Sequence, residues 1–121
     1  MLHIFSFEKL TVWKDSKELI KAIYLVTKKF PEEEKFGLTS QLRRASVSVA
    51  SNIAEGTSRV SAKDKAHFTT ISYSSLMEIL NQVIISNELG FMSDEDYRII
   101  RSSIEKISNK LNALRKSQLN K

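Results

Sequence analysis

A regular series of apolar residues runs through the C-terminal part of the chain. Its members are Tyr97, Ile100, Ile104, Ile107, Leu111 and Leu114, at alternating spacings of three and four. Such spacing places side chains on one face of an α-helix, but on both faces of a strand. Because a helix with an exposed apolar face is marginal in water by itself, the series predicts a protein in which other helices cover this face.

Three earlier segments also have apolar residues at a helical period, and little in the composition interrupts them. The 121 residues include only three Gly and one Pro, which favours long helices over a turn-rich β fold. We predict helices over residues 8–30, 33–58, 62–89 and 94–116. Short connections favour antiparallel neighbours, so the expected structure is one domain, 1–121, folded as an all-α, antiparallel up-down-up-down four-helix bundle. The tail after Arg115 is expected to fray.

The ends of these helices carry recognisable signals. Pro31 is predicted to close the first helix and to open the second, with the acids Glu32–Glu34 at the positive end of the second helix. Ser61 and Ser93 are N-cap candidates for the third and fourth helices. Gly90 suits the position that follows the third helix.

The chain is basic, with a formal net charge of +5. Residues 1–30 carry six Lys against three acids, and residues 91–121 sum to +3. Basic segments favour a polyanionic partner such as RNA or DNA, although a solubilising surface without such a partner would have the same composition. The candidate contacts lie in stripes on the first and fourth helices, and they are Lys14, Lys17, Lys21, Arg98, Arg101, Lys106 and Lys110. No zinc finger, RNP motif or GXXG loop occurs, so binding is expected to be electrostatic and not base-specific.

Residues that commonly take part in catalysis or metal binding are scarce. There is no cysteine, and His3 and His67 lack partners at metal-binding spacing. No GxSxG elbow, Walker loop or dinucleotide fingerprint occurs, so we predict a protein that is not an enzyme and has no catalytic residue, metal or cofactor. Trp13, Tyr24 and Phe68 lie on apolar helical faces and are expected in the core, not on a base-stacking platform. The N-terminus lacks a signal-peptide pattern and no apolar run reaches the roughly 20 residues that span a bilayer, so we expect a cytoplasmic protein without membrane contact.

Residues 41–59 are rich in small side chains. The predicted core face of the second helix, 33–58, consists of Leu38, Leu42, Ala45, Val49, Ile53 and Gly56. Beside it runs a polar stripe of Gln41, Arg44, Ser48, Ser51, Glu55 and Arg59. This stripe is either a solvated face or a subunit interface, and Arg43, Arg44 and Arg59 are candidates for nucleic-acid contact or for assembly. Asn52 borders the core and is expected to bond a neighbouring helix, because a buried unsatisfied amide costs about 1–3 kcal/mol.

Long stretches of the chain match the pattern of one family. They are FEKLTVWKDSKELIKAIY at 7–24, FP at 30–31, EKFGLTSQLRRASVSVASNIAEGTSR at 34–59, SSLMEIL at 74–80 and the Leu89–Gly90 helix end. With these motifs the chain resembles the four-helix-bundle family encoded by intervening sequences in bacterial 23S ribosomal RNA genes, also called S23 ribosomal proteins. One departure is Ala50, where Pro is common in the family, and it leaves the second helix uninterrupted.

The resemblance implies small antiparallel bundles, some of which form homopentamers, with no established catalytic activity. The family is similar to the accessory variability determinant of diversity-generating retroelements, a basic pentamer that binds nucleic acid. On this basis we favour the interface interpretation of the polar residues, which are Gln41, Arg43, Arg44, Ser48, Ser51, Asn52, Glu55 and Arg59. The resulting hypothesis is that the protein is a non-catalytic homo-oligomer that binds RNA electrostatically. Among the possible oligomers, we favour a pentamer. The alternative is an oligomeric scaffold that binds a protein partner and no nucleic acid.

Overall fold

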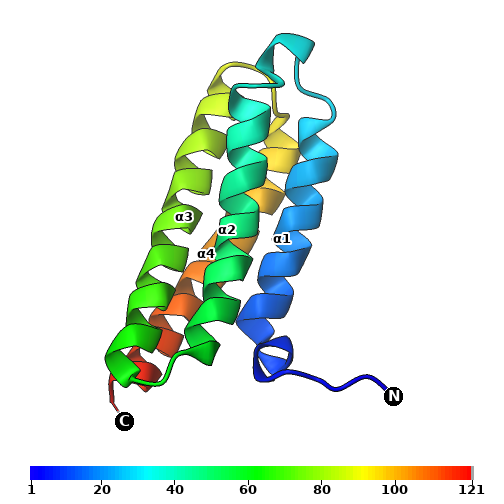
Figure 1. Cartoon of the computed structure of the whole chain (residues 1–121). Coiled ribbons are helices and arrows are strands. Elements are labelled where there is room, and N and C mark those ends of the chain that lie inside the picture. The colour runs from blue at the N-terminus through cyan, green and yellow to red at the C-terminus, as the bar shows by residue number, and fades with distance from the viewer. Residues whose placement is uncertain (121) are drawn as a thin grey trace.

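Four α-helices run alternately up and down around a common core (Figure 1). The computed structural model describes residues 1–120. Its helices are α1 (Thr11–Thr27), α2 (Leu38–Ser58), α3 (Ala62–Glu88) and α4 (Asp94–Leu119), with two short 3-10 helices, η1 (Ser6–Lys9) and η2 (Glu32–Glu34). Each α-helix contacts two neighbours: α1 lies against α2 and α4, and α3 lies against the same two helices. The predicted all-α, antiparallel four-helix bundle is thus confirmed.

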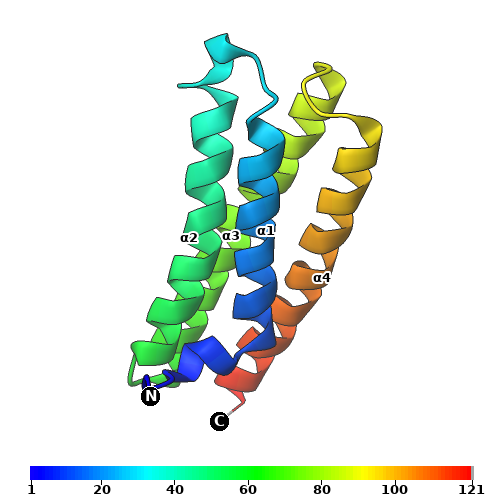
Figure 2. The same cartoon turned by 90° about the vertical axis from the view of Figure 1, so that its right-hand side faces the viewer.

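The connections alternate between the two ends of the bundle. In Figure 2, α1 faces the viewer, with α2 and α4 on either side and α3 behind it. The α1–α2 and α3–α4 connections lie at the upper end in both views, whereas the α2–α3 connection and both termini lie at the lower end. The N-terminal segment and η1 therefore lie far from the loop that contains η2.

The apolar faces of the helices meet in the core as their spacing predicts. On α4 the buried apolar residues are Ile100, Ile104, Ile107 and Leu111. On α2 they include Leu42, Ala45, Val49, Ile53 and Gly56, and Leu38 packs against the core from its edge. Truncating one large buried side chain to Ala typically costs about 2–5 kcal/mol, so these faces strongly favour one arrangement of the helices.

The first two helices are shorter than predicted. α1 begins at Thr11 and not at residue 8, because Leu10 is extended (φ −74°, ψ 126°) and separates α1 from η1. It ends at Thr27 and not at residue 30, since Pro31 disfavours helical geometry in the residue before it. The prediction that the acids after Pro31 begin the second helix is wrong: they form η2, and α2 begins at Leu38.

The predicted signals at the ends of α3 and α4 are confirmed. The hydroxyl oxygens of Ser61 and Ser93 accept hydrogen bonds from the N–H groups of Asp64 and Asp96, each at 3.1 Å. Gly90 follows α3 with φ +82°, a conformation that glycine adopts without steric cost. Ser61 thus marks the start of α3, whereas Gly90 and Ser93 mark the two ends of the α3–α4 connection.

The end of α4 is longer than predicted. The tail after Arg115 does not fray but continues as helix to Leu119. Gln118 is buried, and its Oε1 accepts a hydrogen bond from the Thr69 hydroxyl at 2.7 Å. This contact ties the last turns of α4 to α3, which local sequence alone does not indicate.

Helices α2 and α3 approach closely along the small-residue segment. Ser72 is buried, and its hydroxyl donates to the Val49 carbonyl oxygen at 2.8 Å. Near the end of α2, a Cβ atom added at Gly56 would lie 3.1 Å from the Cβ of Phe68 on α3. Larger side chains here would overpack the contact, so the small residues set the distance between α2 and α3 within one molecule.

Candidate nucleic-acid interface

Four exposed lysines share the outer side of α1 and of the residue that directly follows it. They are Lys14, Lys17, Lys21 and Lys28, and together we call them the α1 lysine face. The Lys17 ammonium lies 4.7 Å from the centroid of the Trp13 ring, and Lys21 pairs at 3.2 Å with Glu18, which is also exposed. Both contacts stay on α1, so the predicted lysines of this helix lie together and point away from the other three helices.

The lysines of α4 do not extend this face. Lys106 and Lys110 turn toward α1, where Asp15 pairs with them at 3.6 Å and 2.5 Å. Partial burial raises the pKa of the Asp15 carboxyl, but the hydrogen bond and charge of Lys110 and the charge of Lys106 outweigh this effect, so the pKa lies below its ordinary value of 3.8. These two lysines therefore hold α1 against α4 and are less available to a partner.

The arginines of α4 lie apart from those lysines. Arg98 is exposed. Arg101 lines a cavity between α3 and α4, and its guanidinium donates to the Tyr97 hydroxyl. Arg101 therefore faces α3, whereas Lys106 and Lys110, which the spacing places on a second, adjoining stripe, face α1.

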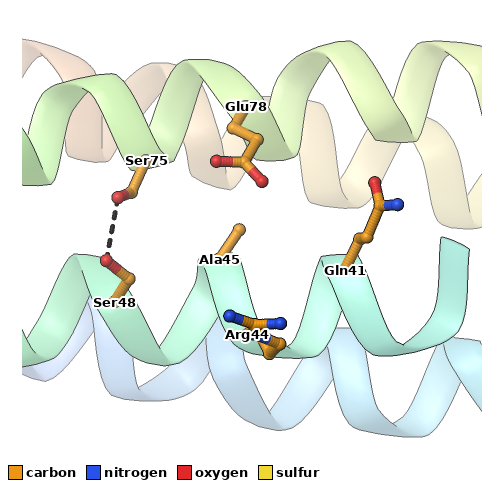
Figure 3. Close-up of a pocket in the computed structure, with 6 residues that line it drawn as sticks. All are labelled: Gln41, Arg44, Ala45, Ser48, Ser75 and Glu78. Carbon is orange, nitrogen blue, oxygen red and sulfur yellow. Dashed lines mark hydrogen bonds between the residues drawn. The ribbon is translucent and has the colours of Figure 1, made fainter. Parts of the chain in front are cut away.

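A polar groove of about 330 Å³ lies between α2 and α3 (Figure 3). Its lining consists of Gln41, Arg44, Ala45 and Ser48 from α2, with Ser75 and Glu78 from α3. The hydroxyls of Ser48 and Ser75 meet across the groove at 2.9 Å. The sequence predicts the α2 side of this groove, but the residues on α3 carry no local signal that pairs them with α2.

A buried glutamine links the two walls of the groove. The Gln82 amide nitrogen donates to Gln41 Oε1 at 3.1 Å and to Glu78 Oε2 at 3.3 Å. Arg44 and Ser51 are exposed on the α2 side. Within residues 1–120, Arg44 forms no ion pair. Part of the predicted polar stripe is therefore used inside the molecule, and Arg44 is left available to a partner.

The C-terminal part of the polar stripe makes contacts close to its own backbone. The Asn52 side-chain nitrogen donates to the carbonyl oxygen of Ser48 at 2.9 Å and to its hydroxyl at 3.1 Å. The prediction that Asn52 bonds a neighbouring helix is wrong, because its partner lies one turn earlier on α2. Glu55 and Arg59 form an exposed pair at 3.9 Å, and the Arg59 guanidinium lies 4.4 Å from the Phe68 ring centroid.

Arg43 binds to the last turns of α1. Its Nε donates to the Thr27 hydroxyl at 2.9 Å, and an Nη donates to the Tyr24 carbonyl oxygen at 3.4 Å. The guanidinium carbon also lies 4.6 Å from the centroid of the Tyr24 ring. The expectation that Tyr24 is a core residue is wrong, since 39% of it is exposed, whereas Trp13 and Phe68 are half-buried. Arg43 thus links α2 to α1, a contact that no local spacing predicts.

The described residues support neither a metal site nor a membrane-spanning helix. Within residues 1–120, no three His, Cys, Asp or Glu side chains gather in a way that could hold a metal ion. In the same part of the chain, every helix is too short or too polar to cross a membrane.

The fold and these surfaces define an antiparallel four-helix bundle with a basic outer face on α1 and a polar groove between α2 and α3. The family model of the 23S rRNA-intervening sequence proteins matches residues 8–113. The chain therefore belongs to this family, which confirms the resemblance seen in its sequence motifs.

A solved structure shares the fold. It is that of a protein of unknown function from the S23 ribosomal protein family of Bacteroides thetaiotaomicron VPI-5482, with a TM-score of 0.78 and 21% sequence identity. The superposition covers 87% of this chain and 98% of the other. At this identity the likeness establishes the fold alone. A search of curated proteins finds no significant match, and the similarity to the retroelement accessory protein stays a prediction.

Proposed function

We propose that this protein is a non-catalytic, self-associating bundle that binds nucleic acid, RNA in preference, in the cytoplasm. The α1 lysine face supports this most directly, because its four exposed lysines have Glu18 as their one ion-pair partner within residues 1–120. Lysines that neutralise a nucleic-acid backbone release condensed counterions, which favours binding without base recognition. Membership in a family named for 23S rRNA intervening sequences favours RNA as the polyanion.

The internal contacts indicate which cations carry the proposed binding. Lys14 and Lys28 are fourteen residues apart, so the α1 lysine face extends over about 21 Å at 1.5 Å per residue. An extended strand can contact it with several successive phosphates. Lys106 and Lys110 are partly neutralised by Asp15, so we assign them a smaller share.

We propose that copies of the chain associate through the α2–α3 groove. Ser48 and Ser51 have small side chains, so a second bundle can approach this surface closely. Arg44 can pair with an acid of the other copy. A pentamer is the favoured size on the basis of the family resemblance. A ring would repeat the α1 lysine face and so increase avidity for one RNA molecule.

Two charge-matched double variants test the proposed RNA contact. Lys14→Glu/Lys21→Glu changes the α1 lysine face, and Lys63→Glu/Lys116→Glu changes two exposed lysines elsewhere. Each replaces two positive by two negative charges, so each lowers the formal net charge from +5 to +1. Binding to a fluorescent single-stranded RNA is measured by anisotropy at about 50 and 200 mM salt.

We expect the α1 variant to weaken binding by about tenfold or more at low salt, and the control variant to weaken it much less. The wild-type affinity is also expected to fall steeply at the higher salt, because each counterion released into a more concentrated salt solution contributes less free energy. Equal weakening by the two variants contradicts the assignment to α1. A wild-type protein that ignores RNA even at low salt contradicts the proposed function itself.

A protein-binding scaffold is the second candidate, and one surface favours it. Leu25 and Ile99 are 63% and 60% exposed beside a cavity of about 360 Å³ between α1 and α4. Exposed apolar side chains that lie together often mark protein contacts. Light scattering with and without RNA separates the two functions, since only the RNA-binding proposal expects the particle mass to rise when RNA is added.

A further inference from the structure

A small cavity lies at the upper end of the bundle, where α1 ends and the loop with η2 leads into α2. Its volume is about 180 Å³, and its polar lining consists of Thr27, Lys28, Glu32, Lys35, Thr39 and Arg43. Three cations and one acid give this lining a net charge of +2. Lys28 is also the last member of the α1 lysine face, so the cavity continues that face at its end.

The guanidinium of Arg43 is held in place at this cavity. Its Nε donates to the Thr27 hydroxyl, one Nη donates to the Tyr24 carbonyl oxygen, and its central carbon lies 4.6 Å from the Tyr24 ring centroid. The remaining Nη group donates to no described residue. A guanidinium whose orientation is already set loses little conformational freedom when it binds an oxyanion.

The size and charge of the cavity restrict its ligand. Pockets for drug-sized molecules usually measure about 300–1,000 Å³, so a cavity of about 180 Å³ suits a phosphate group and is too small to enclose a whole nucleotide. A phosphate monoester carries about −1.5 to −2 charges at neutral pH, which matches the lining better than the single charge of a backbone diester. Such a monoester occurs at the end of a nucleic-acid strand.

We infer that this cavity binds the terminal phosphate monoester of an RNA strand whose backbone follows the α1 lysine face. The inference rests on the proposed function, and it adds that the protein prefers strand ends with a phosphate. Arg43 contributes the oriented hydrogen-bond donors, and Lys28 and Lys35 contribute charge. The sequence does not reveal the site, because its cations come from α1, the loop and α2.

The first experiment compares two RNA oligonucleotides of the same sequence, one with a 5′-phosphate and one with a 5′-hydroxyl. Anisotropy is measured with the full chain at one fixed salt concentration. Hydrogen bonds to charged groups are among the stronger ones in proteins, and we expect the phosphorylated strand to bind about tenfold more tightly. Equal affinity for the two strands overturns the inference, while binding of both leaves the proposed function standing.

Two double variants then test whether the preference for the phosphorylated strand depends on the cavity. Lys28→Gln/Lys35→Gln removes two exposed cations that hold no helix to another, and Lys63→Gln/Lys116→Gln removes the same charge elsewhere. We expect the first variant to lose most of the preference for the phosphorylated strand, and the second to keep it at lower overall affinity. A preference that survives in the first variant overturns the inference.

Titration with inorganic phosphate supplies a readout that needs no RNA. The amide resonances of residues 27–43 are expected to shift at millimolar phosphate in the wild type and to shift less in Lys28→Gln/Lys35→Gln. If these resonances do not respond, the inference is overturned. If they respond but no RNA binds, the cavity is supported as a site for free phosphate compounds, and the proposed function and the assignment to RNA ends are both contradicted.

Discussion

The α2–α3 contact and the α1–α4 contact hold the bundle together by different means. Between α2 and α3, buried Ser72 and Gly56 allow the backbones to approach, and little volume can be added. Between α1 and α4, Asp15 lies between Lys106 and Lys110 at the edge of the bundle, where water reaches the ion pairs. Both contacts share the apolar core, but the α2–α3 contact is limited by shape, whereas the edge of the α1–α4 contact also carries charges that solvent partly screens.

This difference explains why equivalent lysine stripes have different roles. The lysines of the α1 lysine face and those of α4 occur at similar helical spacings. Asp15 lies on the side of α1 that faces α4, and it engages Lys106 and Lys110. The α1 lysine face has exposed Glu18 in place of such a partly buried partner. A single acid at the helix contact therefore separates structural lysines from available ones.

The largest effect is expected where volume is added to the α2–α3 contact. Ser72→Leu should destabilise the bundle by about 2–4 kcal/mol, because it overpacks a fully buried position and removes the hydrogen bond to Val49. Ser74→Leu is the matched control, since Ser74 is exposed on the same helix. Urea denaturation followed by circular dichroism measures both free energies of unfolding. Similar values for the two variants would show that the α2–α3 contact is more adaptable than its geometry indicates.

A smaller effect is expected at the α1–α4 contact. Asp15→Asn should destabilise the protein by about 1 kcal/mol at neutral pH, because the ion pairs with Lys106 and Lys110 are lost but lie at the edge of the bundle. The control is Glu18→Gln, which removes the exposed pair with Lys21 and should have almost no effect.

The pH dependence of the Asp15 effect has a definite sign. The folded-state pKa of Asp15 lies below its ordinary value of 3.8, so the stabilisation is fully present above that value and is lost as the pH falls through the folded-state pKa. The unfolding free energies of the wild type and of Asp15→Asn are therefore expected to converge as the pH is lowered below about 4. A constant difference across this range would mean that the carboxylate charge is not the cause.

The sequence predicts the fold well because the relevant signals are local. Apolar spacing identifies the core faces of α2 and α4, and Ser61, Ser93 and Gly90 mark helix ends through hydrogen bonds or backbone angles within four residues. The boundaries around Pro31 are less predictable, because residues 32–34 form η2 and not the first turn of α2. α2 begins at Leu38, whose N–H donates to the Glu34 carboxylate at 3.2 Å.

The candidate site is predicted less completely because its contacts join residues far apart in the sequence. Lys110 pairs with Asp15 across 95 positions, and Arg43 with Thr27 across 16. A helical wheel shows which residues share a face, but it does not show which neighbouring helix that face meets. For this reason the sequence groups Lys106 and Lys110 with the cations available to a partner, although both pair with Asp15. It also predicts a neighbouring helix as the partner of Asn52, although Asn52 bonds Ser48 on its own helix.

The smallest effect on stability, and the sharpest test of the α2–α3 surface, is expected at Arg44. The guanidinium is exposed and forms no ion pair within residues 1–120, so Arg44→Ala should change the free energy of unfolding by less than about 0.5 kcal/mol. If copies of the chain associate through the groove, the same variant should lower the mass seen by light scattering at a given protein concentration. Lys63→Ala, which removes an exposed cation far from the groove, should leave that mass unchanged. A wild-type protein that is monomeric, or an Arg44→Ala protein with the wild-type mass, would mean that the small residues of α2 serve only the close contact with α3.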